Sequence, residues 1–92
     1  MATRLLPAAP NPFNPLTTLR FTLAESGPIH LFVVDQRGRR VRTLASGPWA
    51  RGAHDVRWDG RDDRGRGVAA GTYLAVLDAP GRRHTEKMAL VR

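Results

Sequence analysis

A long polar loop near the middle of the chain reads Trp58-Asp-Gly-Arg-Asp-Asp-Arg-Gly-Arg-Gly-Val-Ala-Ala-Gly-Thr-Tyr73. Asp, Gly and Arg crowd its interior, whereas both ends are aromatic residues large enough to be buried. This pattern predicts a structural corner, in which one strand ends at Trp58 and the next begins near Tyr73.

The carboxylates and glycines of this loop are interpreted as turn residues. Asp side chains accept backbone N–H bonds, and glycine adopts the left-handed conformation that closes many tight turns. Asp62-Asp-Arg-Gly65 repeats an earlier Asp-x-x-Gly pattern, Asp35-Gln-Arg-Gly38, which predicts a type I hairpin turn. The residues given a structural role are Trp58, Asp59, Gly60, Asp62, Gly65, Asp35 and Gly38.

A calcium site at Asp59, Asp62 and Asp63 is the alternative, because oxygen-rich loops bind calcium. The EF-hand pattern is not met, since Arg61 and Arg64 interrupt it and alanine stands where the distal Glu belongs. The arginines also supply the positive charge that a cation would bring. We therefore expect no metal and no cofactor.

Outward from the loop, hydrophobic residues alternate with polar ones in several short segments, with the period of two of half-buried strands. Residues 45–52 are predicted as a loop, and residues 29–35, apolar on both faces, as a central strand. No segment has helical periodicity. The expected strands are residues 17–23, 29–35, 39–44, 54–58, 71–78 and 84–91. Such spacing predicts an all-β fold, an immunoglobulin- or fibronectin-III-like antiparallel sandwich of about six to seven strands.

The first residues differ in composition from the rest. Between Pro7 and Pro15 a proline recurs every second or third position, which forbids helix and a central strand. We predict an extended linker or tail over residues 1–16 and a single sandwich over residues 17–92. Phe13 is the one large apolar group of the proline-rich stretch, and it can tuck against the domain edge.

Composition narrows the function. The 92 residues contain no cysteine, no apolar run long enough to span a membrane and no signal-peptide core at the N-terminus. Neither serine lies in a nucleophile motif, and the three histidines fall on separate predicted strands. The sequence predicts a protein that is not an enzyme and has no small-molecule substrate.

A net charge of +7, almost all from arginine, permits binding to nucleic acid or another polyanion. If successive strands alternate in direction, the turn near residue 37 and the long loop share one end of the sandwich. That end gathers Arg37, Arg39, Arg40, Arg61, Arg64 and Arg66, together with Asp35, Asp59, Asp62 and Asp63. The carboxylates cancel much of the field and no aromatic platform is interleaved, so polyanion binding is a weaker alternative.

Several motifs in order resemble a known family. They are Pro10-Asn-Pro-Phe-Asn-Pro15, Thr18-Leu-Arg-Phe21, Val34-Asp-x-x-Gly-Arg39, Trp58-Asp-Gly-x-Asp62, Gly71-Thr-Tyr73 and the terminal Lys87-Met-x-Leu-Val-Arg92. The pattern is similar to the immunoglobulin-like domain of the flagellar hook-capping protein. It is closer to the C-terminal type A sorting domains of bacterial type IX secretion substrates.

This resemblance implies a non-catalytic module at the end of a larger secreted or cell-surface bacterial protein, with a passenger domain before it. Its partner would be the secretion or surface-attachment machinery. The positions carried over as signal residues are Gly71, Tyr73 and Lys87. The alternative is a structural or adhesive module, like the hook-cap domain, that packs on neighbouring domains.

Overall fold

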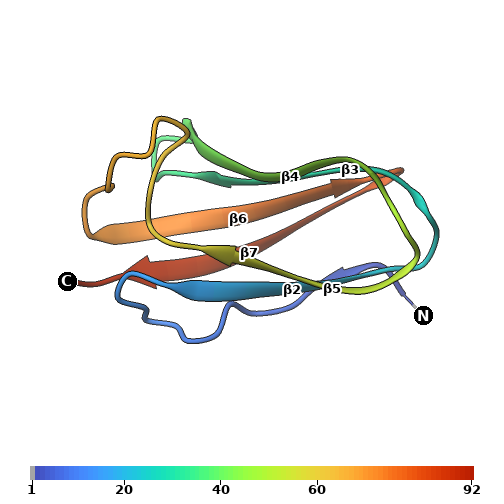
Figure 1. Cartoon of the computed structure of the whole chain (residues 1–92), viewed down its shortest axis with the longest axis horizontal. Helices are drawn as coiled ribbons and strands as arrows, with labels where there is room; N and C mark the ends of the chain where they lie inside the picture. The colour runs from blue at the N-terminus through green and yellow to red at the C-terminus, as the bar shows by residue number, and fades with distance from the viewer. Residues whose placement is uncertain (1) are drawn as a thin grey trace.

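The computed structural model describes residues 2–92, which form a sandwich of two antiparallel sheets (Figure 1). The predicted all-β class is confirmed. The strands are β1 (Arg4–Leu5), β2 (Thr17–Leu23), β3 (Gly27–Val34), β4 (Arg40–Trp49), β5 (Gly52–Trp58), β6 (Gly71–Ala79) and β7 (Arg82–Leu90). Within residues 2–92 no helix is long and apolar enough to cross a bilayer.

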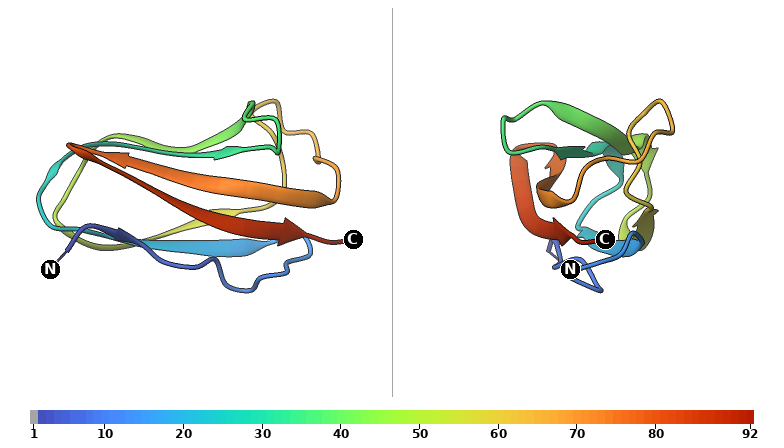
Figure 2. Two further views of the ribbon diagram at one scale, coloured as in Figure 1. Left: turned by 180° about the vertical axis from the view of Figure 1, so that it is seen from behind. Right: turned by 90° about the vertical axis from the view of Figure 1, so that its left-hand side faces the viewer.

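One sheet has three strands in the order β1-β2-β5, and the other has four in the order β4-β3-β6-β7. The end view in Figure 2 shows the two layers. Strand β3 lies between β4 and β6, which fits its apolar character on both faces. The hairpin turn at Asp35 follows its sequence signal, because Gly38 (φ 79°) takes the left-handed conformation that the turn requires. Gly81 (φ 74°) takes the same conformation in the turn between β6 and β7.

Strand β4 corrects the predicted loop at residues 45–52. The strand continues to Trp49, which pairs with Gly27 at the start of β3. Two irregularities mark the first half of β4, where register shifts leave Val41 and Leu44 without partners of their own and break the period of two. Pro48 is tolerated because β4 is an edge strand, where a missing N–H costs no ladder bond.

The segment before Thr17 is extended, as expected, but it packs on the sandwich. Leu5 pairs with Phe21 of β2, and Phe13 forms a parallel bridge with Leu90 of β7. Leu5, Ala8 and Phe13 are buried. The segment therefore contacts both sheets, one through β2 and the other through β7, and the sandwich begins well before the predicted boundary at residue 17. The prolines of this segment lack a backbone N–H, which is tolerated because the segment forms only a few isolated backbone hydrogen bonds.

An aromatic column fills one end of the core. The Trp58 ring centroid lies 5.5 Å from that of Phe13 and 5.4 Å from that of Tyr73, the latter edge-on. All three side chains are buried, and each comes from a different part of the chain: the N-terminal segment, β5 and β6. Large aromatic groups contribute heavily to core stability, so this column joins the three segments at one end of the sandwich.

Candidate functional site

The corner loop after β5 is built on hydrogen bonds to its carboxylates. The Trp58 Nε1–H donates to the Arg61 carbonyl (2.9 Å), which anchors the first turn. Asp62 Oδ1 accepts the N–H groups of Arg64 (2.9 Å) and Arg66 (3.0 Å). Asp59 Oδ1 accepts the Arg61 N–H. The loop carboxylates thus serve as turn acceptors.

The hairpin between β3 and β4 repeats this geometry. Asp35 Oδ1 accepts the N–H groups of Arg37 (2.9 Å) and Arg39 (3.0 Å), and Gly38 donates to the Asp35 carbonyl (3.0 Å). Backbone bonds, chiefly from Arg39 and Arg66 respectively, hold the pKa of the Asp35 and Asp62 carboxyls below the usual value. Both groups are therefore ionised acceptors near neutral pH.

The two turns lie together, as expected from strands that alternate in direction. Asp63 donates its N–H to the Val41 carbonyl (3.0 Å) and accepts the Thr43 N–H on Oδ1 (2.9 Å). The corner loop thereby covers the first part of the β4 edge. A shallow depression of about 410 Å³ lies between the turns, lined by Asp35, Arg40, Asp62 and Arg64 among others.

The six arginines of this end do not form one basic patch. Arg39 pairs with Asp35 (3.1 Å) and Arg61 with Asp59 (3.7 Å). The Arg40 guanidinium instead lies 4.0 Å from the centroid of the Phe32 ring, on the outer face of the four-stranded sheet. Exposed pairs of this kind contribute little to stability, but they neutralise part of the charge.

The other candidate chemical groups are dispersed. His30, His54 and His84 lie on β3, β5 and β7. Across residues 2–92, no group of three or more His, Asp or Glu side chains is arranged to hold a metal ion, and this includes the carboxylates of the calcium alternative.

The three signal residues implied by the resemblance occupy different faces. Gly71 opens β6 opposite Leu90, and the Tyr73 side chain points into the core opposite Met88. Lys87 is exposed and pairs with Leu74, whose side chain points away from the core. Lys87 is therefore accessible to a partner, whereas the Tyr73 side chain is buried and packs in the core.

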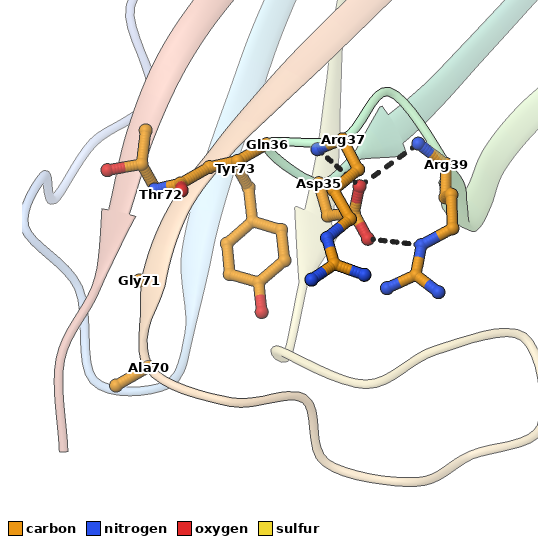
Figure 3. Close-up of a pocket in the computed structure, with 8 residues that line it drawn as sticks. All are labelled: Asp35, Gln36, Arg37, Arg39, Ala70, Gly71, Thr72 and Tyr73. Carbon is orange, nitrogen blue, oxygen red and sulfur yellow. Dashed lines mark hydrogen bonds and ion pairs between the residues drawn. The ribbon is translucent and has the colours of Figure 1, made fainter.

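Tyr73 is held by a local bond and borders a small hollow. Its hydroxyl donates to the Ala69 carbonyl (2.5 Å), the backward contact known in immunoglobulin sandwiches as a tyrosine corner. Burial raises the pKa of the Tyr73 phenol, and the nearby Asp35 carboxylate raises it further. Figure 3 shows the hollow, about 220 Å³, between the turn at Asp35 and residues 70–73.

Residues 16–82 match the family model of the FlgD Ig-like domain. The chain belongs to that family. The FlgD Ig-like domain is a structural, non-enzymatic family, and the two-sheet sandwich described above is its fold. No curated protein matches the chain by sequence.

Solved structures with the same fold include two proteins of Porphyromonas gingivalis, FlgD proteins and the DNA glycosylase AlkC of Pseudomonas fluorescens. Dimeric latent PorU from Porphyromonas gingivalis is 21% identical, with a TM-score of 0.70 over 99% of this chain and 10% of PorU. PorZ, a surface component of the type-IX secretion system of the same organism, is 20% identical (TM-score 0.59; 99% of this chain and 12% of PorZ). FlgD from Xanthomonas campestris, described for hook capping in flagellar assembly, is 25% identical (TM-score 0.63; 95% of this chain, 65% of FlgD). The chain thus spans about a tenth of the two Porphyromonas proteins.

Two structural features of this FlgD Ig-like domain do not follow from the sequence patterns. The first is the contact of Asn11 with β7, which the proline-rich composition conceals. The second is a partly apolar outer face on the four-stranded sheet. A signal for it was present, since residues 29–35 and 71–78 are apolar at successive positions, but that pattern cannot say whether the outer face is covered.

Proposed function

We propose that this domain is a non-catalytic sorting or surface-attachment module of a larger exported bacterial protein. The observation that carries the proposal is its size relationship to PorU and PorZ. The same sandwich accounts for 99% of this chain but only 10% and 12% of theirs, so it occurs as a small unit within much longer proteins, one of them a surface component of the type-IX secretion system. The motif resemblance to type A sorting domains supports the same role, with a secretion or attachment protein as its partner and the outside of the cell as its location.

Recognition would use the free edge of β7, the last strand of the four-stranded sheet. Asn11 and Phe13 bond the backbone of Ala89 on the side away from β6: the Ala89 N–H donates to Asn11 Oδ1 and the Phe13 N–H to the Ala89 carbonyl, both at 2.9 Å. Because backbone groups alternate in direction along a strand, Thr85 faces the same way. Among residues 2–92 nothing outside the sheet ladder bonds the Thr85 backbone, so this stretch is open to pairing with a partner strand.

A secretion assay tests the proposal. Residues 2–92 are fused behind an exported fluorescent reporter in a bacterium with an active type IX system. Thr85→Pro removes the outward N–H and restricts the edge, whereas Thr85→Ala keeps the backbone and removes only the side chain. We expect reporter outside the cell with the unaltered chain and with Thr85→Ala, and a strong loss with Thr85→Pro.

Each arm has a distinct meaning, provided that circular dichroism shows every variant folded. Export of Thr85→Pro at the unaltered level would exclude the β7 edge but leave the sorting role. Periplasmic retention of the unaltered fusion would overturn the sorting role. It would favour a structural module that packs on neighbouring domains, the function supported by the family match and by the likeness to X. campestris FlgD.

A further inference from the structure

The outer face of the four-stranded sheet carries apolar side chains that the core does not account for. Phe32 and Val76 are only 4% and 5% exposed, yet they lie on the opposite face of β3 and β6 from the core cluster. Val34 and Leu74 pair across the same two strands and are half-buried. On a sheet face that contacts only water, these positions normally carry polar side chains. The apolar side chains on this outer face therefore need an explanation.

Part of this face is already covered. The Arg40 guanidinium lies over the Phe32 ring at 4.0 Å, and the His30 ring lies 5.0 Å from it. The other part, around Val34 and Leu74, opens into a hollow of about 260 Å³ that is lined mainly by apolar surface and borders Lys87. We call this the outer-face hollow, defined by Val34, Asp35, Gln36, Thr72, Leu74 and Lys87.

Positive charge stands on both sides of the apolar pair. Arg40 pairs across β4 and β3 with Val34, and Lys87 pairs across β7 and β6 with Leu74. Neither cation has a carboxylate within ion-pair distance in the described residues. Two carboxylates lie near this surface, and each is paired with an arginine: Asp35, which lines the hollow, with Arg39 at 3.1 Å, and Asp78 with Arg83 through two bonds of 2.6 and 2.8 Å. The hollow is thus an apolar site with Lys87 at its rim and the Arg40 guanidinium beside it, over the neighbouring Phe32 ring.

We propose that the outer-face hollow docks an extended acidic segment of a partner protein, with one apolar side chain inserted between Val34 and Leu74. This deepens the proposed function and rests on it, since it names a second surface, beside the β7 edge, through which the attachment partner would be recognised. A second copy of the chain does not fit, because pairing the same faces would bring Arg40 and Lys87 against like charges. Nucleic acid fits poorly, because Arg40 already occupies the Phe32 ring and leaves no stacking platform.

The strand spacing specifies the pattern of that segment. The Cα atoms of Arg40 and Lys87 lie three strand spacings apart, or about 14 Å at roughly 4.8 Å per strand. An extended segment that crosses the strands covers about 13 Å in four residues, with positions i, i+2 and i+4 facing the sheet. The matching motif is acid-x-apolar-x-acid, whose central residue enters the hollow while its two carboxylates meet the cations.

The test is a titration of the ¹⁵N-labelled full chain, followed by amide chemical shifts, with the synthetic peptide Gly-Ser-Asp-Thr-Leu-Thr-Asp-Ser-Gly. This method detects millimolar affinities, so weak binding by a short peptide is still measured. We expect the largest shifts at Val34, Thr72, Leu74 and Lys87. Replacing the central leucine of the peptide by serine should abolish these shifts.

Charge-reversal variants distinguish a specific binding site from general electrostatic attraction of the acidic peptide to the positively charged chain. Lys87→Glu should weaken binding of the acidic peptide about three- to tenfold and should improve binding of the matching Lys-Thr-Leu-Thr-Lys peptide. Arg57→Glu is the matched control, because it makes the same change in net charge on exposed β5 in the other sheet. Equal weakening by both variants, shifts centred on the turns at residues 36–39 and 61–66, or no shifts at millimolar peptide would each overturn the docking site.

The two proposals fail separately. Normal export of the reporter fusion with no peptide binding would overturn the docking site and leave the sorting role intact. Peptide binding that Lys87→Glu weakens as expected, with an unaltered fusion that stays in the periplasm, would leave the docking site and overturn the sorting role.

Discussion

Replacing Phe13 by alanine tests whether the N-terminal segment belongs to the fold. The Phe13 side chain is 1% exposed, and its ring lies 5.5 Å from that of Trp58. Truncating a buried Phe to Ala costs about 3 to 5 kcal/mol, through lost apolar burial and the cavity left behind. The whole domain is expected to have a free energy of unfolding of roughly 5 to 14 kcal/mol, so Phe13→Ala should remove a large share of it.

The assay is urea denaturation followed by tryptophan fluorescence, with thermal unfolding as a second measurement. For a domain of this size each kcal/mol lowers Tm by about 4 to 8 °C, so a fall of at least about 12 °C is expected. Leu16→Ala is the control, because Leu16 is a large apolar residue of the same segment that is 46% exposed. It should change the free energy of unfolding by less than about 0.5 kcal/mol. Equal, small effects of the two substitutions would show that the segment is a free linker and refute the packing argument.

Three further predictions concern the corner loop and its neighbours. The folded-state pKa of Asp62 lies below its ordinary value of 3.8, so the ionised carboxylate stabilises the folded domain above about pH 4, and this stabilisation is lost as pH falls through the folded-state pKa. When the free energy of unfolding is measured against pH, Asp62→Asn should lose less stability below pH 4 than the unaltered chain. An identical loss in the two proteins would contradict this. Gly60 and Gly65 both have positive φ, but only at Gly60 would an added Cβ approach Pro15, at 3.3 Å. Both alanine variants should lose roughly 1 to 3 kcal/mol through left-handed backbone strain. Gly60→Ala should lower Tm more than Gly65→Ala does, because it adds the contact with Pro15. Tyr73 is the single tyrosine of the chain, and its raised pKa predicts that phenolate absorbance titrates with a midpoint above pH 10 while the protein is folded; a midpoint at or below 10 would place the hydroxyl in water.

The strands with unbroken alternation could be predicted from sequence, and the irregular ones could not. Strands β2, β5 and β6 follow their periodicity closely, and the Asp35 turn follows its Asp-x-x-Gly signal, because both depend on local geometry alone. The second half of β4 escaped prediction because its pairing comes from β3 rather than from its own Gly-Pro sequence. The N-terminal segment escaped because proline spacing describes its conformation and says nothing about what it touches.

The arrangement of the candidate site could also be predicted only in part from the sequence. That the hairpin turn and the corner loop share one end follows from alternating strand direction, and the structure places them together. The faces of the signal residues depend on register, which no local pattern fixes. Tyr73 pairs with Met88 and points inward, so Lys87 falls opposite Leu74 and points outward; a shift of one residue would exchange the two.

The bonds between the N-terminal segment and β7 also set the order in which the domain can be completed. Asn11 and Ala89 are 78 residues apart in the chain, and Phe13, which packs beside Trp58, also pairs with Leu90. A chain that emerges N-terminus first, from a ribosome or a translocation channel, cannot form these contacts until Ala89 and Leu90 have appeared. Completion of this domain therefore waits for the arrival of β7.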